Sequence, residues 1–145
     1  NITLALSLHA PNDEIRRTIM PVANKYALKD VICACDYYFK KTGRRVSYEY
    51  SLVAGVNDNI EEAKKLVKLV NGRIIHINLI PVNPIKERDF KQSDKLKIKA
   101  FREFLEKKGV NATVRREMGR DIDGACGQLR RRFIETNGGS ESLEV

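Results

Sequence analysis

One cysteine of this sequence, Cys126, lies in a segment whose composition suits thiol chemistry. The stretch 121–125 reads Asp-Ile-Asp-Gly-Ala, and Gly-Gln-Leu follows the cysteine. Small neighbours leave the backbone free to bend and the sulfur open to approach, whereas a structural cysteine is usually surrounded by bulky apolar residues. We therefore interpret Cys126 as a reactive thiol. The alternative is a small residue that fills a gap in a turn.

Arginines gather around this cysteine in the sequence. The chain has 27 Lys+Arg against 19 Asp+Glu residues, a formal net charge of +8. The arginines nearest the cysteine are Arg115, Arg116, Arg120, Arg130, Arg131 and Arg132. A positive field of this kind attracts polyanions such as RNA, although a solvated basic surface is the alternative. Because no repeat of aromatic and arginine residues predicts a stacking groove, we expect charge and shape to hold any RNA.

The other two cysteines, Cys33 and Cys35, receive no chemical role. They lie two residues apart on a predicted helix, so they point to different sides and cannot converge on one metal ion. Cys35 falls on the apolar face and is expected in the core. An odd number of cysteines without framework spacing fits a reducing, cytoplasmic compartment. No apolar run of about 18 residues predicts a membrane span, and the amino end does not resemble a signal peptide.

Four apolar, β-branched segments alternate with helical patterns, which predicts strands at 2–8, 45–53, 74–80 and 112–116. The helices are expected to begin near Asn12 or Asp13, before Val31, at an Asp58 or Asn59 cap, and at a Ser93 cap. Pro21 and the glycines Gly43, Gly72 and Gly109 are expected to end them. The inward faces are expected to include Val31, Ile32, Cys35 and Phe39; Ile60, Ala63, Leu66, Val67 and Val70; and Leu96, Ala100, Phe101, Phe104 and Leu105.

This alternation predicts an α/β fold with parallel strands, either part of a (β/α) barrel or an open sheet. We expect one domain at residues 1–133 and a flexible tail at 134–145. Chemistry in such folds gathers at the carboxyl ends of the strands, here 7–10, 55–58, 81–84 and 117–127. His9, Asn57 and Asn83 would each be ordinary structural residues when taken alone. Their recurrence at the same end of successive strands favours ligand binding.

In order along the chain, several motifs resemble one enzyme family. They are Leu6-Ser7-Leu8-His9-Ala10, Glu49-Tyr50 with Gly55-Val56-Asn57-Asp58, Ile77-Asn78-Leu79-Ile80-Pro81-Val82-Asn83, Arg115-Arg116, and the Cys126 segment. Over residues 1–133 the chain resembles the carboxyl half of the catalytic barrel of radical S-adenosylmethionine RNA methyltransferases, the RlmN/Cfr family. The resemblance implies methylation of C2 of adenine in 23S rRNA and tRNA, and a fold that is part of a radical S-adenosylmethionine barrel.

The resemblance also implies roles for individual residues. Ser7, Leu8 and His9 would line the S-adenosylmethionine site, and Asn83 would hydrogen-bond the same cofactor. Cys126 would carry the methyl group as S-methylcysteine. The arginines expected to contact RNA are Arg115, Arg116 and Arg120. In the family, a [4Fe-4S] cluster and a reductant generate a radical from a second S-adenosylmethionine. A radical route is needed because the ring carbon of adenine is too poor in electrons to attack a sulfonium methyl directly.

The chain departs from the family in having no CxxxCxxC loop, the three-cysteine motif that holds such a cluster. We therefore expect no residue of this chain to bind the cluster. Residue 1 is Asn and lies at the start of a predicted strand, so we interpret the chain as a fragment that is inactive alone. An uncovered 2–8 strand would then favour self-association.

Three alternatives stay open at this point. The sister branch of the family methylates C8 of adenine and shares the motifs above. A noncatalytic basic RNA-binding module would make Cys126 incidental. An ordinary barrel enzyme acting on a phosphorylated metabolite would use the arginines for phosphate, but the chain offers no Gly-rich strand-to-helix loop of the phosphate-binding type.

Overall fold

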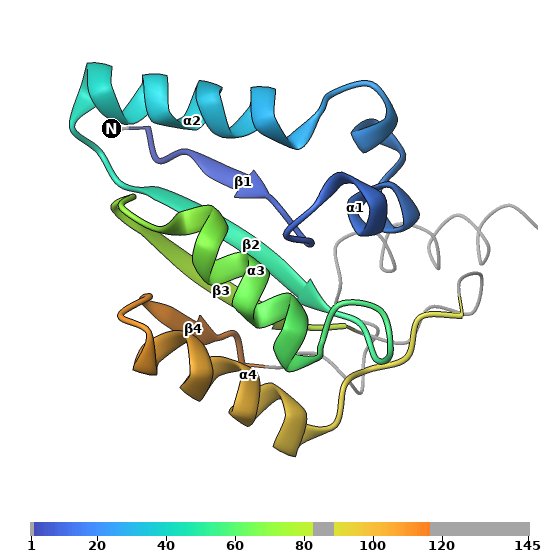
Figure 1. Ribbon diagram of the computed structural model, residues 1–145. Coiled ribbons are helices and arrows are strands. Elements are labelled where there is room, and N and C mark those ends of the chain that lie inside the picture. Colours follow the sequence, from blue (N-terminus) through green and yellow to red (C-terminus); the bar gives the residue numbers. More distant parts are fainter. Residues whose placement is uncertain (1, 83–88, 117–145) are drawn as a thin grey trace, which may run out of the picture. The chain divides into compact units, whose positions relative to one another are not determined.

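The computed structural model describes residues 2–82 and 89–116, which form a parallel sheet with helices packed on it (Figure 1). The strands are β1 (Ala5–Ser7), β2 (Val46–Leu52), β3 (Ile75–Pro81) and β4 (Ala112–Val114). The helices are α1 (Asp13–Ile19), a 3-10 turn η1 (Pro21–Asn24), α2 (Leu28–Thr42), α3 (Ile60–Val70) and α4 (Lys95–Lys107). Within these residues the strands pair in the order β1-β2-β3-β4, each pair parallel. The predicted α/β fold with parallel strands is confirmed.

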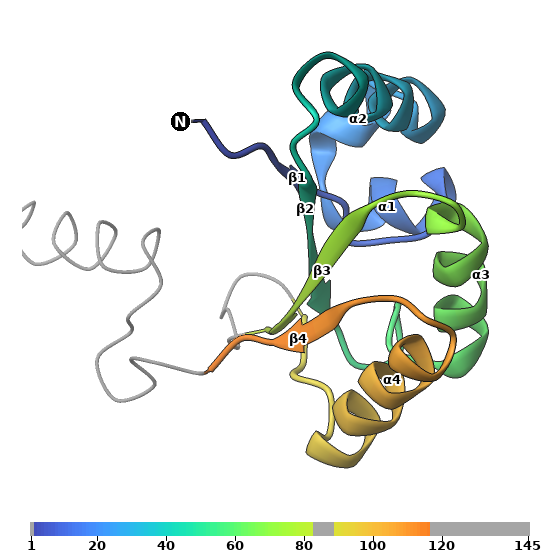
Figure 2. The same ribbon diagram turned by 90° about the vertical axis from the view of Figure 1, so that its left-hand side faces the viewer.

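The helices α2, α3 and α4 all lie on one side of the sheet (Figure 2). The strands therefore bury every second side chain: Val46, Tyr48, Tyr50 and Leu52 of β2, and Ile75, Ile77 and Leu79 of β3. Strands covered on both faces read as continuous apolar runs, so this alternation indicates that one face only is packed by the described helices. The residues between them, together with Ser7 and Thr113, form what we call the polar face: Ser7, Ser47, Glu49, Ser51, His76, Asn78 and Thr113.

Helix α2 ends as the sequence predicted. Gly43 adopts a left-handed conformation with φ of 66°, and its N–H donates to the Phe39 carbonyl at 2.7 Å. A residue with a Cβ is strained at this φ, which is why glycine suits the position. Cys35 is buried in the core and Cys33 is exposed, as expected.

Short polar side chains begin the helices. Asn12 caps α1 and Asn59 caps α3, in each case by accepting from the N–H three residues later. The prediction that Ser93 caps the last helix was wrong. Asp94 takes that role by accepting from the Leu96 N–H at 2.9 Å, and the buried Ser93 hydroxyl instead donates to Asp58. The two residue types cap helices about equally well, so the contact that engages Ser93 with Asp58 explains why Asp94 is the cap.

The predicted inward face of α4 was partly wrong. Phe101 and Leu105 are buried and Phe104 packs against the core, but Leu96 is 75% exposed and Ala100 is also exposed. Ile98 is buried in their place. Ile98, Phe101 and Leu105 follow the spacing of one helical stripe, whereas Leu96 lies two residues before Ile98 and faces away. In α3, Ile60, the first residue of the helix, is likewise exposed.

Strand β1 is shorter than predicted and lies at the margin of the described sheet. Before the strand, the Leu4 carbonyl still accepts from the Ser47 N–H, whereas the Ile2 carbonyl accepts from the Tyr38 hydroxyl and from the Arg44 guanidinium at 2.9 and 3.1 Å. Ile2 itself is 77% exposed. Such a margin is where another strand could pair, so self-association through 2–8 stays a prediction.

Residues 117–145 lie outside the described part of the chain, and so the division into a domain at 1–133 and a tail at 134–145 stays a prediction. Among residues 2–82 and 89–116, no helix has the length and apolar composition needed to cross a bilayer. Within the same residues, His, Cys, Asp and Glu side chains form no group of three or more that could hold a metal ion.

The orientation of α4 predicts unequal effects for two leucines of the same helix. Leu105→Ala should lower the free energy of unfolding by about 2–5 kcal/mol, because Leu105 is fully buried. Leu96→Ala, the matched control on the exposed side, should change it by less than about 0.5 kcal/mol. Urea denaturation followed by circular dichroism measures both values, and equal losses in the two variants would contradict this packing.

Candidate functional site

The turn after β1 is held in an uncommon backbone conformation. His9 has a φ of 60°, the one positive value among the described non-glycine residues. The N–H groups of Leu8 and His9 both donate to the Glu49 carbonyl, at 3.0 and 3.2 Å. The His9 ring then reaches across β2, where its Nδ1 accepts from the Ser51 N–H at 3.0 Å. A non-glycine residue keeps such a conformation only when its surroundings fix it, and here β2 supplies those contacts.

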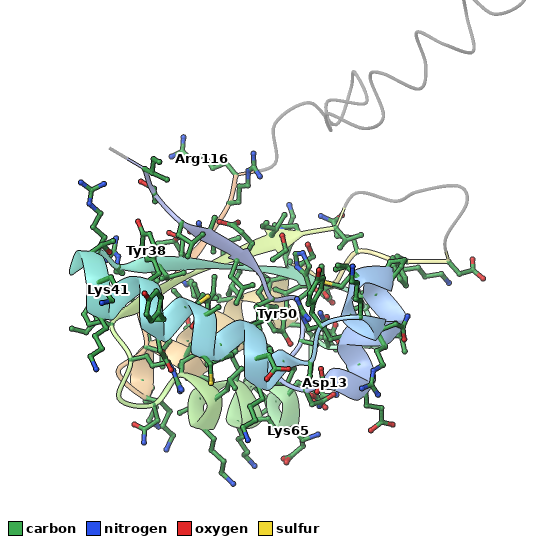
Figure 3. The ribbon with its side chains drawn as sticks, turned by 90° about the horizontal axis from the view of Figure 1, so that it is seen from above. Asp13, Tyr38, Lys41, Tyr50, Lys65 and Arg116 are labelled. Carbon is green, nitrogen blue, oxygen red and sulfur yellow. The ribbon has the colours of Figure 1, made fainter. Side chains whose placement is uncertain are left out.

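Asn57 joins three segments at this end of the sheet. Its Nδ2 donates to the carbonyls of His9 and Ser51, at 2.7 and 2.6 Å, and its Oδ1 accepts from the Val53 N–H at 2.7 Å. The side chain is fully buried, and the Tyr50 hydroxyl (Figure 3) donates to the Asn57 carbonyl. Both amide protons are used, so Asn57 shapes the site and has no donor left for a ligand.

A buried carboxylate supports the loop that follows β2. Asp58 accepts from the Gly55 N–H at 3.0 Å and from the Ser93 hydroxyl at 2.9 Å, and Lys97 lies 4.0 Å from the same carboxylate. Gly55 itself has a φ of 73°. The segment 55–58, which the sequence predicts at a ligand site, is therefore fixed by Asp58, which bonds Gly55 within the segment and contacts Ser93 and Lys97 near the start of α4.

Arg16 of α1 is a feature of the site that the sequence did not reveal. Its Nε donates to the Leu8 carbonyl and its Nη2 to the Ser7 carbonyl, at 3.1 and 3.2 Å. The side chain is buried, and burial lowers its pKa while Asp13 opposes that shift. Its Nη1 has no hydrogen-bond partner in the described part of the chain. An arginine in a helix usually indicates a solvated face, so periodicity gave no signal for it.

His9 is neutral in this setting. Burial lowers its pKa, the nearby Arg16 charge lowers it further, and Glu49 acts in the opposite direction. Because Nδ1 accepts the Ser51 hydrogen bond, the proton of the neutral ring lies on Nε2. His9 is thus available as a hydrogen-bond donor through Nε2.

The residues predicted to bind the cofactor differ in how they lie. Ser7 is exposed at the end of β1, and His9 is partly buried beside it. The side chain of Leu8 is fully buried in the core, and both its N–H and its carbonyl are engaged. The side chain of Leu8 is therefore not accessible, and a ligand could contact only the backbone of this residue. Asn83 lies outside the described residues, so the site as a whole stays a prediction.

Of the residues predicted to meet RNA or to react, Arg115 is exposed directly after β4, and its N–H donates to the Leu79 carbonyl at 2.8 Å. Arg116 is also exposed. Arg120 and Cys126 lie outside the described residues, and their roles stay predictions.

A row of polar side chains crosses all four described strands and begins at Ser7, two residues before His9. Ser7 pairs with Glu49, Glu49 with Asn78, and Asn78 with Thr113 in the strand register. Asn78 Nδ2 donates to Glu49 Oε1 at 2.9 Å, and the Thr113 hydroxyl donates to Asn78 Oδ1 at 3.1 Å. We call these four residues the polar row. From the sequence, Glu49 and Asn78 were singled out only as members of motifs. The pattern that would have predicted the row is the presence of polar residues at alternate positions of otherwise apolar strands.

Replacing Asn57 should destabilise the fold through lost hydrogen bonds. Asn57→Asp keeps the shape and the acceptor for Val53, but it places a carboxylate against the carbonyls of His9 and Ser51. We expect a loss of about 2–4 kcal/mol in the free energy of unfolding, as for buried polar groups left unpaired. The matched control, Asn111→Asp at an exposed position, should change it by less than about 0.5 kcal/mol. Equal losses would rule out this role for Asn57.

Protonation of His9 should also destabilise the fold. The unfolded chain has the ordinary His pKa of 6.5 and the folded chain a lower one. The stabilisation is therefore complete above 6.5 and is lost as the pH falls from there toward the folded-state pKa. Urea unfolding at about pH 8 and about pH 5 should show a larger loss in the wild type than in His9→Asn, which tolerates positive φ but does not titrate. Parallel losses in the two proteins would contradict the assignment.

Comparison with known proteins gives close sequence relatives. No family model matches the chain. The probable dual-specificity RNA methyltransferase RlmN of Lachnospira eligens is 64% identical over 134 residues, which cover 92% of this chain and 38% of that protein. The protein of the same name from Clostridium perfringens strain 13 is 58% identical over 137 residues, 94% of this chain and 40% of its own length. The chain thus spans about two fifths of the length of these relatives.

Solved structures give the same picture for the fold. A radical SAM methyltransferase from Sphaerobacter thermophilus superposes with a TM-score of 0.86 at 44% identity, over 90% of this chain and 38% of that one. A domain of pyruvate-formate lyase-activating enzyme from Bacteroides vulgatus has a TM-score of 0.61 at 18% identity, over 79% of this chain and 67% of that one, and shares the fold alone. The parallel sheet described here therefore matches part of a radical SAM barrel, and the chain is similar in sequence to about two fifths of the RlmN proteins.

Proposed function

We propose that this chain is the part of a radical SAM RNA methyltransferase that binds S-adenosylmethionine at the carboxyl end of its sheet and carries the methyl group on Cys126. The observation that carries the proposal is the 64% identity to the L. eligens RNA methyltransferase over 134 residues. An aligned stretch of 134 residues in a chain of 145 must include Cys126. The similarity therefore covers the proposed reactive cysteine as well as the described sheet.

The described residues at the carboxyl end of the sheet fit a nucleoside cofactor. The Ser7 hydroxyl is exposed, the Nε2 of the neutral His9 is a donor, and Glu49 presents a carboxylate on the adjacent strand. Directed donors and acceptors of this kind orient a ligand that carries hydroxyl, amino and carboxylate groups. Asn83, two residues after β3 in the sequence, would add a further amide. S-adenosylmethionine, when bound, supplies the methyl group and the means of activating it.

Cys126 would act as the nucleophile of the first transfer. Its thiolate forms a new S–CH3 bond while the bond from the sulfonium sulfur to the same methyl breaks, which leaves a neutral thioether on each side. The thiolate is the reactive form, and nearby arginines in the sequence favour it while Asp121 and Asp123 oppose it.

Arg115, Arg116 and Arg120 are proposed to contact phosphates of the RNA substrate. Such contacts position a nucleic acid without reading its sequence, so they are compatible with both rRNA and tRNA. We propose C2 of adenine in 23S rRNA and tRNA as the site of methylation. The [4Fe-4S] cluster would be held elsewhere in the whole enzyme, since this chain has no CxxxCxxC motif.

The test uses the full-length enzyme purified from cells, with mass spectrometry of the peptide that contains Cys126. We expect a fraction of that peptide to gain the mass of one CH2 unit, and Cys126→Ala to abolish RNA methylation. Cys33→Ala, at an exposed position of α2, is the matched control and should remain active.

Three outcomes would overturn parts of this proposal. Normal methylation by Cys126→Ala would favour a noncatalytic RNA-binding role for this region. Methylated RNA that contains 8-methyladenosine in place of 2-methyladenosine would assign the chain to the C8 branch. A Cys126 peptide that never gains mass during turnover would exclude the carrier role.

A further inference from the structure

The hydrogen bonds of the polar row run in one direction, toward Glu49. The Thr113 hydroxyl has a single proton, which it donates to Asn78 Oδ1. His76 Nε2, 2.9 Å from the same hydroxyl oxygen, must therefore be the donor in that contact. Asn78 in turn donates its amide proton to Glu49 Oε1. His76 thus donates to Thr113, Thr113 to Asn78, and Asn78 to the Glu49 carboxylate, where the series ends.

At that end of the row, two polar atoms have no hydrogen-bond partner in the described part of the chain. Among residues 2–82 and 89–116, no group donates to Glu49 Oε2, and the Ser7 hydroxyl, which lies opposite Glu49 in the register, makes no hydrogen bond. Both residues are on the polar face, away from the helices. A carboxylate oxygen held in place by a fixed neighbour, with its partner oxygen free, is ready to accept from a ligand.

Glu49 is also tied to the residues assigned to the cofactor. Its backbone carbonyl accepts from both Leu8 and His9, so the Glu49 Cα cannot move independently of the 7–9 segment. The register places the Glu49 and Ser7 side chains on the same face of neighbouring strands. A ligand that touches the Ser7 hydroxyl is therefore within reach of the Glu49 carboxylate.

We propose that Glu49 accepts hydrogen bonds from the ribose hydroxyls of the S-adenosylmethionine bound at this site, with Asn78 holding the carboxylate in position. The inference rests on the proposed function and adds a contact residue to it. A carboxylate can accept from two neighbouring hydroxyls at once, and nucleotide-binding folds commonly use an acidic residue in this way. The same carboxylate would repel a phosphate group. Glu49 therefore suits ligand hydroxyls, whereas the arginines proposed for RNA suit phosphates.

The test measures ligand affinity in the full-length enzyme by calorimetry, with S-adenosylhomocysteine as the probe because it cannot donate a methyl group. Glu49→Gln keeps the shape and lets Asn78 bond the remaining carbonyl oxygen, but it turns an NH2 donor toward the ligand. We expect the affinity to fall about 10- to 100-fold, as for a lost hydrogen bond to a charged group. Glu103→Gln, an exposed glutamate of α4, is the matched control and should bind as the wild type does.

Ligands that lack one hydroxyl make the assignment specific. The 2′-deoxy and 3′-deoxy forms of S-adenosylhomocysteine should include at least one that binds the wild type about 10-fold or more weakly than the parent ligand. In Glu49→Gln that penalty should shrink to within about threefold, because the acceptor for the missing hydroxyl is already absent. The wild-type comparison needs no variant, so it stands even where Glu49→Gln fails to fold.

The outcomes separate the two proposals. Unchanged affinity in Glu49→Gln, or equal deoxy penalties in both proteins, overturns the role of Glu49 and leaves the proposed function intact. Equal binding of parent and deoxy ligands by the wild type does the same. Absence of S-adenosylhomocysteine binding in the wild type overturns the proposed function and this inference with it.

Discussion

The carboxyl end of the sheet depends on one buried amide. Asn57 connects the turn after β1, the end of β2 and the loop before α3 through its bonds to His9, Ser51 and Val53. The strand pairing of β1 with β2 ends there, because β1 ends at Ser7 and its chain turns at His9. A buried amide with all its partners in place fixes their relative positions in a way that apolar packing, which has no direction, does not. The backbone of His9, a residue that we assign to the cofactor, is positioned directly by this amide.

One-sided packing is what makes the polar face available. Helices α2, α3 and α4 bury the apolar side chains of the strands, so the polar residues between them do not have to be paired within a core (Figure 2). A carboxylate and an amide in the middle of a doubly covered sheet would cost several kcal/mol each unless fully bonded. On this face, Asn78 is the one residue of the described part of the chain that bonds the Glu49 carboxylate, and water can satisfy its other oxygen.

Sequence patterns were enough to predict the order of strands and helices, the parallel sheet and several helix ends, because each depends on local spacing and capping. They failed where a tertiary contact competes with a local preference. Ser93 is a good helix cap by local preference, but its hydroxyl donates to Asp58. Arg16 would be expected on the surface of its helix, but its guanidinium donates to the Ser7 and Leu8 carbonyls. The polar row was invisible for a related reason, since its members come from four strands and only the register brings them together.

The charges around the 7–9 turn also determine which ligand groups each part of the proposed site favours. Arg16 is buried and committed to two backbone carbonyls, and its charge helps to keep His9 neutral. Of the seven residues that we define as the polar face, Glu49 is the one with a carboxylate. A negative group there favours ligand hydroxyls and the sulfonium charge of S-adenosylmethionine, and it disfavours the RNA backbone. Under the proposed function, RNA phosphates would then be attracted to Arg115, which directly follows β4, and disfavoured next to Glu49.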